Sequence, residues 1–429
     1  MEPTINDYAT WYEATAKRRK LAPMLRGKAI CDVCVVGGGL AGLTTALELS
    51  RRGLKVVLLE ARLIGSGASG RNGGFVSNGF ALGMNDVKRH TGKAAAQSLY
   101  DLSRQGTEYV RSEIASGDPS IKMGDGWMVA VRYADKGALK AYGDGLQYEY
   151  NEDVVHYTAD ETRQSLSSKR YFESLYFPKA FHIHPLRYCL LLADKALASG
   201  VQIFENNPAR STVKSSAGFI VRTDGGEVQA QHVVHCVSST GRDVHPASGR
   251  AVLPVATYIA VTETLQQTSI NTSVAISDTR RAGNYYRLLT GGNILWGGRI
   301  TTRISPPRQV AELMRGDMIA TYPELNQTRI EYAWAGLMGY ALHKMPLIGR
   351  DVEGQWFATA FGGHGLNTTA MAGLILARAI ADGDDSYRQF VPFAPQWAYG
   401  QFGRIGVQGT YWMMQLRDKL DESRLLSSR

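Results

Sequence analysis

The sequence predicts an α/β fold of two domains, and three observations lead to this prediction. The chain has 429 residues, which is more than one hydrophobic core usually holds. Between residues 28 and 60, an apolar strand, a glycine turn, a helix and a second apolar strand follow one another. In residues 253–264 and 284–300, β-branched and aromatic residues alternate around pairs of glycines, which predicts an antiparallel sheet.

The composition is that of an ordinary globular protein, with 44% hydrophobic and 20% charged residues. The formal charge of +9 arises from 48 Lys and Arg against 39 Asp and Glu without a long basic run, so we expect no nucleic-acid partner. No segment reaches the roughly 18 apolar residues of a membrane span, and residues 1–30 lack the apolar run of a signal peptide. We therefore expect a soluble, cytoplasmic protein with no membrane partner. Its four cysteines fit a reducing compartment.

The stretch CDVCVVGGGLAG contains two motifs that bear on chemistry. Cys31 and Cys34 form a C-x-x-C, but the valines around them predict a strand, where residues three apart point to opposite faces and cannot form a disulfide. Gly37, Gly39 and Gly42 give G-x-G-x-x-G directly between this strand and the following helix. We therefore assign the chemistry to the glycines.

These glycines, together with Glu60, predict a binding site for the ADP part of a dinucleotide. Gly37 permits a tight turn, Gly39 lets the backbone approach a pyrophosphate, and Gly42 lets the helix lie against the strand. The first amides of the helix then point at the phosphates. Glu60 ends the second strand at about the expected separation of 20 residues and can accept hydrogen bonds from ribose hydroxyls.

Two further segments indicate a flavin dinucleotide. The glycine-rich loop 61–75 places Ser69, Arg71 and Asn72 where donors reach the second half of a cofactor. Near the other end of the chain, a glycine turn at 362–365 leads into a helix predicted over 367–381, whose positive end can stabilise negative charge on a reduced isoalloxazine. Both ends of the chain are thus expected to bind one FAD.

The sequence resembles the D-amino-acid-oxidase-like FAD oxidoreductases, from about Tyr8 to Leu420. Six segments carry this resemblance, in the order CDVCVVGGG, IGSGASGRNGG, FHIHPLRY, NYYRLLTGGNILWGGR, WAGLMGYALHKMPLIGR and FGGHGLNTTAMAG. Within that superfamily they are most similar to the gamma-glutamylputrescine oxidases. The resemblance implies a Rossmann-like FAD-binding domain and a second α+β substrate domain built on an antiparallel sheet.

We expect the FAD-binding domain to be discontinuous, because two distant glycine motifs must share one cofactor. It would comprise residues 28–88, 178–250 and 335–385, and the substrate domain would comprise 89–177 and 251–334. An N-terminal segment, 1–27, and a helical tail, 386–429, complete the chain.

The expected cofactor contacts follow from the motifs and the resemblance. They are Gly37, Gly38, Gly39, Leu40, Ala41, Gly42, Glu60, Ala61, Arg62, Ala68, Ser69, Arg71, Asn72, Gly73, Ala209, Gly336, Gly363, His364, Gly365, Leu366, Asn367 and Thr368. Relatives with covalent flavin use a cysteine at the position that Gly336 resembles, and no cysteine follows Cys236. We therefore expect non-covalent FAD.

The resemblance implies oxidation of an amine at the carbon that bears the nitrogen. We expect His364 in the second glycine turn to act at the active site by polarising it, by accepting a proton, or by fixing the turn with hydrogen bonds. Lys344 is the second catalytic candidate, as a positive charge near flavin or oxygen, with a solvated surface lysine as the alternative. His182 and His184 lack further ligands at suitable spacing, so no metal is expected.

The prediction of the substrate class depends on Met338. Amino-acid oxidases of this superfamily hold the substrate carboxylate with an arginine at the position that Met338 resembles. A thioether cannot pair with a carboxylate, so we expect a polyamine-type primary amine, oxidised with oxygen to an aldehyde, ammonia and hydrogen peroxide. Arg287 or Arg299 could supply a carboxylate clamp from another direction instead, or could bind the distant glutamyl carboxylate of a conjugate.

Tyr285, Tyr286 and Trp296 of the predicted sheet could line the substrate pocket, with core packing as the alternative, and we expect Tyr286 and Trp296 beside Met338 to contact the substrate. Three other functions stay open at this point. They are an amino-acid or sarcosine-type oxidase, a dehydrogenase that passes electrons to a carrier, and a non-catalytic flavin-binding subunit. The sequence leaves the oligomeric state open.

Overall fold

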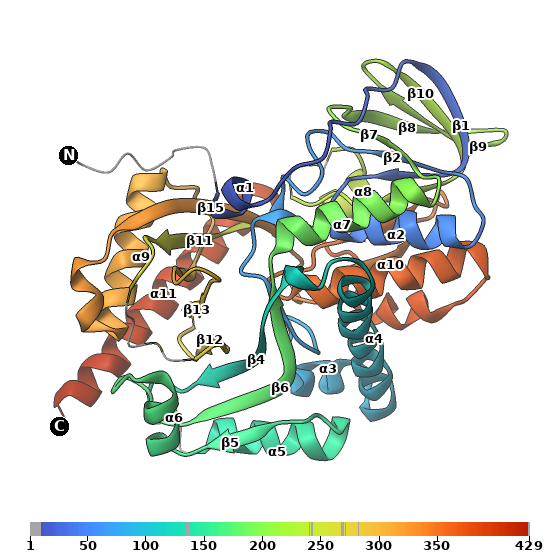
Figure 1. The fold of residues 1–429 in the computed structure, drawn as a ribbon. Helices are drawn as coiled ribbons and strands as arrows, with labels where there is room; N and C mark the ends of the chain where they lie inside the picture. Colours follow the sequence, from blue (N-terminus) through green and yellow to red (C-terminus); the bar gives the residue numbers. More distant parts are fainter. Residues whose placement is uncertain are drawn as a thin grey trace.

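A computed structural model gives the fold of the chain (Figure 1). It describes residues 10–133, 137–239, 241, 243–266, 270, 272–281 and 283–427. Tyr8, where the similarity begins, lies outside the described residues with the rest of 1–9, as do residues 428–429 of the predicted tail. Within the described ranges, none of the helices combines the length and the apolar character that crossing a membrane requires.

The first sheet has a parallel core. Its order is β16-β17-β10-β1-β2-β7, and only β16 at its edge is antiparallel to its neighbour along this path. The strands are β1 (Gly27–Val36), β2 (Val56–Leu59), β7 (Gln202–Phe204), β10 (Gly226–His235), β16 (Leu347–Arg350) and β17 (Trp356–Thr359). Every residue of β2 is buried, as expected for a parallel strand that is covered on both faces.

Helices and a small antiparallel layer cover the two faces of this sheet. Val33 and Val35 of β1 pack in the core that includes α2 (Leu40–Arg51), α7 (Pro185–Ala198) and α10 (Gly365–Ala381), which lie side by side in Figure 1. Cys34 and Val36 pack in another cluster, with residues of β8 (Ala209–Ser215) and β9 (Gly218–Thr223). The helix α4 (Lys93–Gly117) packs against α10 from outside.

The second sheet is mostly antiparallel. Its order is β15-β11-β14-β13-β12-β4-β6-β3, with β5 on β6, and only the β12 and β4 pair is parallel. The strands are β3 (Phe75–Val76), β4 (Lys122–Ala130), β5 (Val155–Tyr157), β6 (Ser174–Ile183), β11 (Leu253–Thr262), β12 (Ala275–Asp278), β13 (Tyr285–Leu288), β14 (Ile294–Thr301) and β15 (Ile330–Tyr340). The predicted α/β fold class with a second, antiparallel-sheet domain is confirmed.

Two strands of the second sheet extend across the domain boundaries that we predicted. Strand β6 continues past residue 178 and β15 begins before residue 335, so both predicted boundaries fall inside strands. In β15 buried residues lie on both sides of residue 335, whereas in β6 the half-buried Pro178 and the exposed Lys179 stand at the predicted boundary although the strand continues to Ile183.

The remaining elements surround the two sheets. They are α1 (Trp11–Thr15), α3 (Met84–Thr91), α5 (Ala138–Tyr150), α6 (Ala159–Leu166), α8 (Pro246–Gly249), α9 (Pro307–Thr321) and α11 (Gly400–Ser427), with the short 3₁₀ turns η1 (Ala68–Gly70), η2 (Pro119–Ile121), η3 (Pro323–Gln327) and η4 (Ser386–Phe393). The helix α11 lies against the second sheet (Figure 1). Arg281 pairs with Asp418 at 2.7 Å and thereby joins the loop after β12 to this helix.

Candidate active site

A cavity of about 1030 Å³ lies between the two sheets. The first sheet contributes the carboxyl ends of β1, β2 and β17 and the residues after β10, and the second sheet contributes residues of β3, β4, β11, β12, β13, β14 and β15. The loop between β2 and β3 and the turn between β17 and α10 complete the walls. Ligands of open α/β sheets bind at the carboxyl ends of the parallel strands. The cavity therefore lies where this fold places a cofactor.

The first glycine turn is held tightly between β1 and α2. Gly37 has a φ of 111°, which favours glycine, and its amide donates to the carbonyl of Leu59 at 2.8 Å. A Cβ on Gly42 would collide with the carbonyl oxygen of Gly37. The helix can therefore approach the turn this closely only because residue 42 has no side chain.

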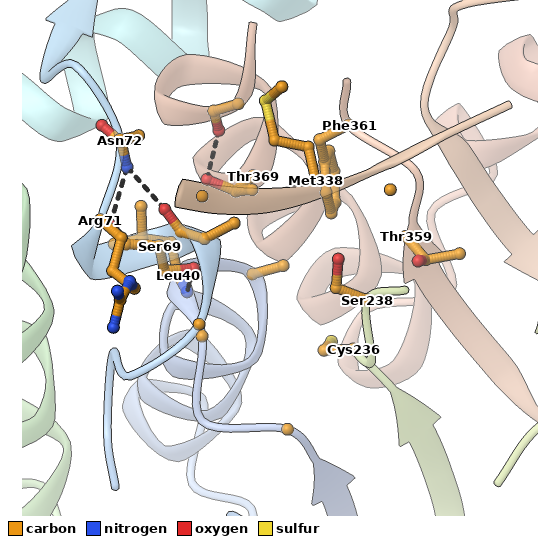
Figure 2. A pocket seen from close by; sticks show the side chains of 18 of the residues that line it. Leu40, Ser69, Arg71, Asn72, Cys236, Ser238, Met338, Thr359, Phe361 and Thr369 are labelled. Carbon is orange, nitrogen blue, oxygen red and sulfur yellow. Dashed lines mark hydrogen bonds between the residues drawn. The ribbon is translucent and has the colours of Figure 1, made fainter. Parts of the chain in front are cut away.

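The glycine-rich loop 61–75 lies across the start of α2. Ser69 Oγ accepts a hydrogen bond from the amide of Leu40 at 3.0 Å, and a Cβ on Gly39 would lie 2.8 Å from that oxygen. Asn72 fixes the loop from within, because its Nδ2 donates to the carbonyls of Ala68 (3.0 Å) and Ser69 (2.8 Å). Figure 2 shows Ser69, Arg71 and Asn72 on one side of the cavity and Cys236, Ser238 and Thr359 on the other.

Glu60 stands at the end of β2 and holds the first turn in place. Its Oε2 accepts from the amide of Gly38 at 2.7 Å, and its Oε1 accepts from the amide of Arg62 at 2.8 Å. Burial raises the pKa of Glu60, and these two backbone hydrogen bonds oppose the rise. Each carboxylate oxygen has a further lone pair for a ribose hydroxyl.

The second glycine turn brings the start of α10 to the same cavity. Gly362 has a φ of 61°, and its amide donates to the carbonyl of Gly339 at 2.9 Å. Gly363, Gly365 and Leu366 line the cavity at the helix N-terminus. The positive ends of α2 and α10 therefore both face one cavity, at sites suited to a pyrophosphate and to a flavin carbonyl.

His364 precedes α10 and lines the cavity. Its Nε2 lies 3.2 Å from the carbonyl oxygen of Ser77 and 3.1 Å from that of Asn78. Two carbonyl acceptors require that Nε2 carries the proton, so Nδ1 is the basic nitrogen. Burial lowers the pKa of His364, so the ring is neutral near neutral pH. These hydrogen bonds connect the second glycine turn to the segment that follows β3.

Nearly all the predicted cofactor contacts line this cavity. The exceptions are Gly42, Asn367 and Thr368: Asn367 Nδ2 donates to the Gly79 carbonyl at 3.1 Å, and Thr368 Oγ1 donates to the His364 carbonyl at 2.6 Å. The residues that line it are Gly37, Gly38, Gly39, Leu40, Ala41, Glu60, Ala61, Arg62, Ala68, Ser69, Arg71, Asn72, Gly73, Ala209, Gly336, Gly363, His364, Gly365 and Leu366.

The structure brings only one of the three predicted substrate residues to the cavity. Met338 of β15 lines it, as does Tyr285 of β13. Tyr286 and Trp296 stack on each other at 4.2 Å, inside the hydrophobic cluster beneath α9. Side chains alternate between the faces of a strand, so Tyr286 points away from the face that Tyr285 lines.

Lys344 and the two arginines of the second sheet lie elsewhere. Lys344 is exposed in the turn after β15 and does not line the cavity. Arg299 pairs through Nε with Asp317 Oδ2 at 2.7 Å. Arg287 is fully buried, and its Nη2 donates to the carbonyl of Ile183 at 2.8 Å.

Several lining residues were missed by the sequence interpretation. Among them are Trp127, Thr257, Tyr340 and Thr359, from four strands. Burial raises the pKa of Tyr340 to about 12, and its hydroxyl lies 2.7 Å from where a Cβ on Gly363 would stand. A signal for Trp127 was present, because Gly126 inside an apolar strand indicates a bulge, and its φ of 83° accompanies a register shift.

The cavity fits FAD in three respects. Two glycine turns leave room for phosphates and for a flat ring, Glu60 offers carboxylate oxygens for a ribose, and two helix N-termini face the interior. Among the described residues, no group of three or more His, Cys, Asp or Glu side chains could hold a metal ion.

Comparison with known proteins identifies the family to which the chain belongs. The profile of the FAD dependent oxidoreductase family (DAO) matches residues 32–379, and the chain belongs to this family. It is an FAD-dependent enzyme, and the family acts on C–N groups of amines and amino acids.

Individual relatives span most of the chain. It is 30% identical over 391 residues to the probable oxidoreductase OrdL of Haemophilus influenzae, covering 87% of this chain and 88% of that protein. It is 29% identical over 389 residues to the gamma-glutamylputrescine oxidoreductase of Escherichia coli, covering 89% and 91%. The crystal structure of glycine oxidase from Bacillus cereus matches with a TM-score of 0.71 at 21% identity, covering 85% of this chain and 98% of that chain.

Proposed function

We propose that the chain is an oxidase that deaminates a polyamine-type primary amine, of which gamma-glutamylputrescine is the model. Amine, oxygen and water would be converted to an aldehyde, ammonia and hydrogen peroxide. Bound FAD supplies the hydride acceptor for the carbon that bears the nitrogen. The similarity to a gamma-glutamylputrescine oxidoreductase across 89% of this chain supports this substrate class.

The observation that carries the proposal is the apolar side chain of Met338 in the cavity wall. A carboxylate beside Met338 would lose several kcal/mol of hydration without an ionic partner from that position, and the arginines that line the cavity in the loop after β2, Arg62 and Arg71, are assigned to the cofactor. Arg287 and Arg299, which could have held a carboxylate, are engaged elsewhere by the Ile183 carbonyl and by Asp317. An amine whose reacting carbon bears no carboxylate avoids this cost.

His364 would orient and polarise the site in this proposal. Its ring is held by the carbonyls of Ser77 and Asn78 and is neutral, because burial lowers its pKa. A neutral ring beside the reacting amine adds no positive charge that would repel an ammonium substrate on entry. Its Nδ1 is left as a hydrogen-bond acceptor.

Steady-state kinetics with an amine panel tests the proposal. We expect kcat/KM to be higher for putrescine and gamma-glutamylputrescine than for glycine, D-alanine and sarcosine, with peroxide released at each turnover. If one of the three amino acids is the best substrate, the interpretation of Met338 is wrong. If the enzyme reduces an artificial dye but releases no peroxide, it is a dehydrogenase and the proposal of an oxidase is wrong.

A further inference from the structure

A second cavity, of about 200 Å³, adjoins the first. Ser77, Phe80, Trp127 and His364 line both cavities, so the two meet at His364. The other walls of the second cavity come from the segment after β3, the start of α3, α4, α5, β4, β6 and the segment between α5 and β5. Its position places it within reach of a ligand that extends beyond the first cavity.

A buried carboxylate lies in this second cavity. Glu152, between α5 and β5, is 6% exposed. Asn78 Nδ2 donates to both of its oxygens, at 3.1 Å and 2.9 Å, and Tyr100 Oη donates to Oε2 at 2.7 Å. Oε1 therefore accepts one hydrogen bond, from Asn78, and has capacity for another donor.

Among the described residues, Arg104 is the ionic partner of Glu152, and it approaches one carboxylate oxygen without donating a hydrogen bond to it. Arg104 Nη2 lies 3.7 Å from Oε2 and donates its own hydrogen bond to the carbonyl of Tyr150 at 2.6 Å. Lys179 also lines the cavity, but its side chain is 68% exposed and its Nζ lies 3.9 Å from Asp153. Arg104 and Tyr100 both contact Oε2, so Oε1, which in the described part of the chain accepts only from Asn78, is the oxygen that could pair with a cation from the ligand.

Aromatic side chains line the same cavity as the carboxylate. Tyr100, Trp127, Tyr142 and Phe177 line the same cavity, and Trp127 stacks on Phe177 with ring centroids 5.0 Å apart. The faces of aromatic rings attract alkylammonium groups, more strongly where water is excluded. Aromatic walls with one buried carboxylate are complementary to an ammonium group on a short alkyl chain.

We propose that the second cavity is a subsite for a distal ammonium group of the substrate, and that Glu152 is the residue that selects for it. The inference rests on the proposed function, because the ligand is the far end of the amine oxidised in the first cavity. The enzyme then prefers diamines and ammonium-bearing conjugates to monoamines of equal length. Trp127 and His364 stand between the two ends of such a substrate.

Putrescine and pentylamine test this subsite, because they have similar length and differ at the distal group. In the wild-type holoenzyme, kcat/KM should be higher for putrescine by about tenfold or more, the value of one buried ionic contact. Glu152→Gln keeps an acceptor for Asn78 but removes the charge. It should lower kcat/KM for putrescine by about tenfold through KM, with kcat and the pentylamine kinetics unchanged within about twofold.

Two variants on α5 serve as matched controls. Glu149, which pairs with Lys88, and Tyr148, which is 87% exposed, line neither cavity. Glu149→Gln and Tyr148→Leu should leave the preference for putrescine intact. Tyr142→Leu, which removes a ring of the second cavity, should reduce that preference and replaces Glu152→Gln if the latter does not fold.

The outcomes separate this inference from the proposed function. If wild type oxidises none of putrescine, pentylamine and gamma-glutamylputrescine, the proposed function fails and the subsite with it. If wild type oxidises both amines equally, or if Glu152→Gln and Tyr142→Leu slow both amines to the same degree, amine oxidation stands and the subsite is refuted. In that case Glu152 only fixes the Asn78 loop.

Discussion

Arg287 Nη1 donates a hydrogen bond to Nδ1 of His182 at 2.7 Å, with both side chains fully buried. The other terminal nitrogen of Arg287 donates to the hydroxyl of Tyr12 at 3.1 Å, and that hydroxyl donates to the carbonyl of Asn72 at 2.8 Å. A buried guanidinium is thus connected to the glycine-rich loop of the cofactor cavity. Three segments distant in sequence depend on this one side chain.

Arg287→Lys should destabilise the protein by about 2–4 kcal/mol, because an ammonium cannot reproduce the fork and leaves buried acceptors unpartnered. Urea unfolding of the apoprotein measures the loss. Arg329→Lys is the matched control, because its side chain is 67% exposed and pairs with Glu263 at the surface; it should change stability by less than about 0.5 kcal/mol. Equal effects of the two variants would contradict the role assigned to Arg287.

Stability should fall as the pH is lowered from about 6.5 towards about 3. Burial lowers the pKa of both His182 and His184 to about 3. In the unfolded chain these rings gain protons below about pH 6.5 that the folded state does not accept. The loss should reach about 1.4 kcal/mol per pH unit for each ring within this window.

His184→Asn isolates one of these contributions. His184 Nδ1 accepts from the amide of Arg187 at 3.2 Å as the N-cap of α7, and an asparagine side chain can accept the same bond without titrating. Urea midpoints at several pH values should show a shallower slope in the variant than in wild type. An unchanged slope would show that His184 does not contribute to the pH dependence.

Gly39 and Gly42 should differ in what their substitution destroys. A Cβ on Gly39 meets the movable hydroxyl of Ser69 inside the cavity, whereas one on Gly42 meets the fixed carbonyl of Gly37. Gly39→Ala should leave the apoprotein folded and weaken FAD binding by about tenfold or more. Gly42→Ala should lower the stability of the apoprotein itself by about 2–4 kcal/mol.

Apoprotein melting temperature and flavin-to-protein absorbance ratio distinguish these two cases. The role given to Gly39 is wrong if Gly39→Ala retains a full complement of FAD with unchanged affinity. The role given to Gly42 is wrong if the Gly42→Ala apoprotein has the melting temperature of the wild-type apoprotein.

FAD should be released when the holoenzyme is precipitated with acid. Of the four cysteines, all of which the structure describes, Cys236 is the one that lines the cavity. It lies beside the first glycine turn. Burial raises the pKa of its thiol to about 12, so it is not a thiolate that could attack a flavin. Yellow supernatant over a colourless pellet is expected, and Cys236→Ser should behave identically. A yellow pellet from wild type would indicate a covalent bond.

The cofactor side of the site could be predicted because its determinants are local in sequence. Gly37, Gly39 and Gly42 occupy one turn, and Glu60 ends the next strand, so spacing alone places them together. The substrate side depends on strand register. Tyr285 and Tyr286 are adjacent in sequence but face opposite sides of β13, and nothing local determines which side meets the cavity.

The second cavity could not be predicted from the sequence, because its polar residues come from unrelated elements. Asn78, Tyr100 and Glu152 meet through tertiary packing of the loop after β3, helix α4 and the end of α5. Each has an ordinary sequence context. A carboxylate after an α-helix usually lies in solvent, and only the fold shows that Glu152 does not.

The order of synthesis has a consequence for how FAD is acquired. The walls of the first cavity run from Val36 to Thr369, and α10 packs against α2. A nascent chain that has exposed the first glycine turn still lacks the turn at residues 362–365 and the helix that covers the neighbouring face of the sheet. FAD can therefore become fully enclosed only after nearly the whole protein has left the ribosome, and until then the apolar face of α2 is exposed to chaperones and proteases.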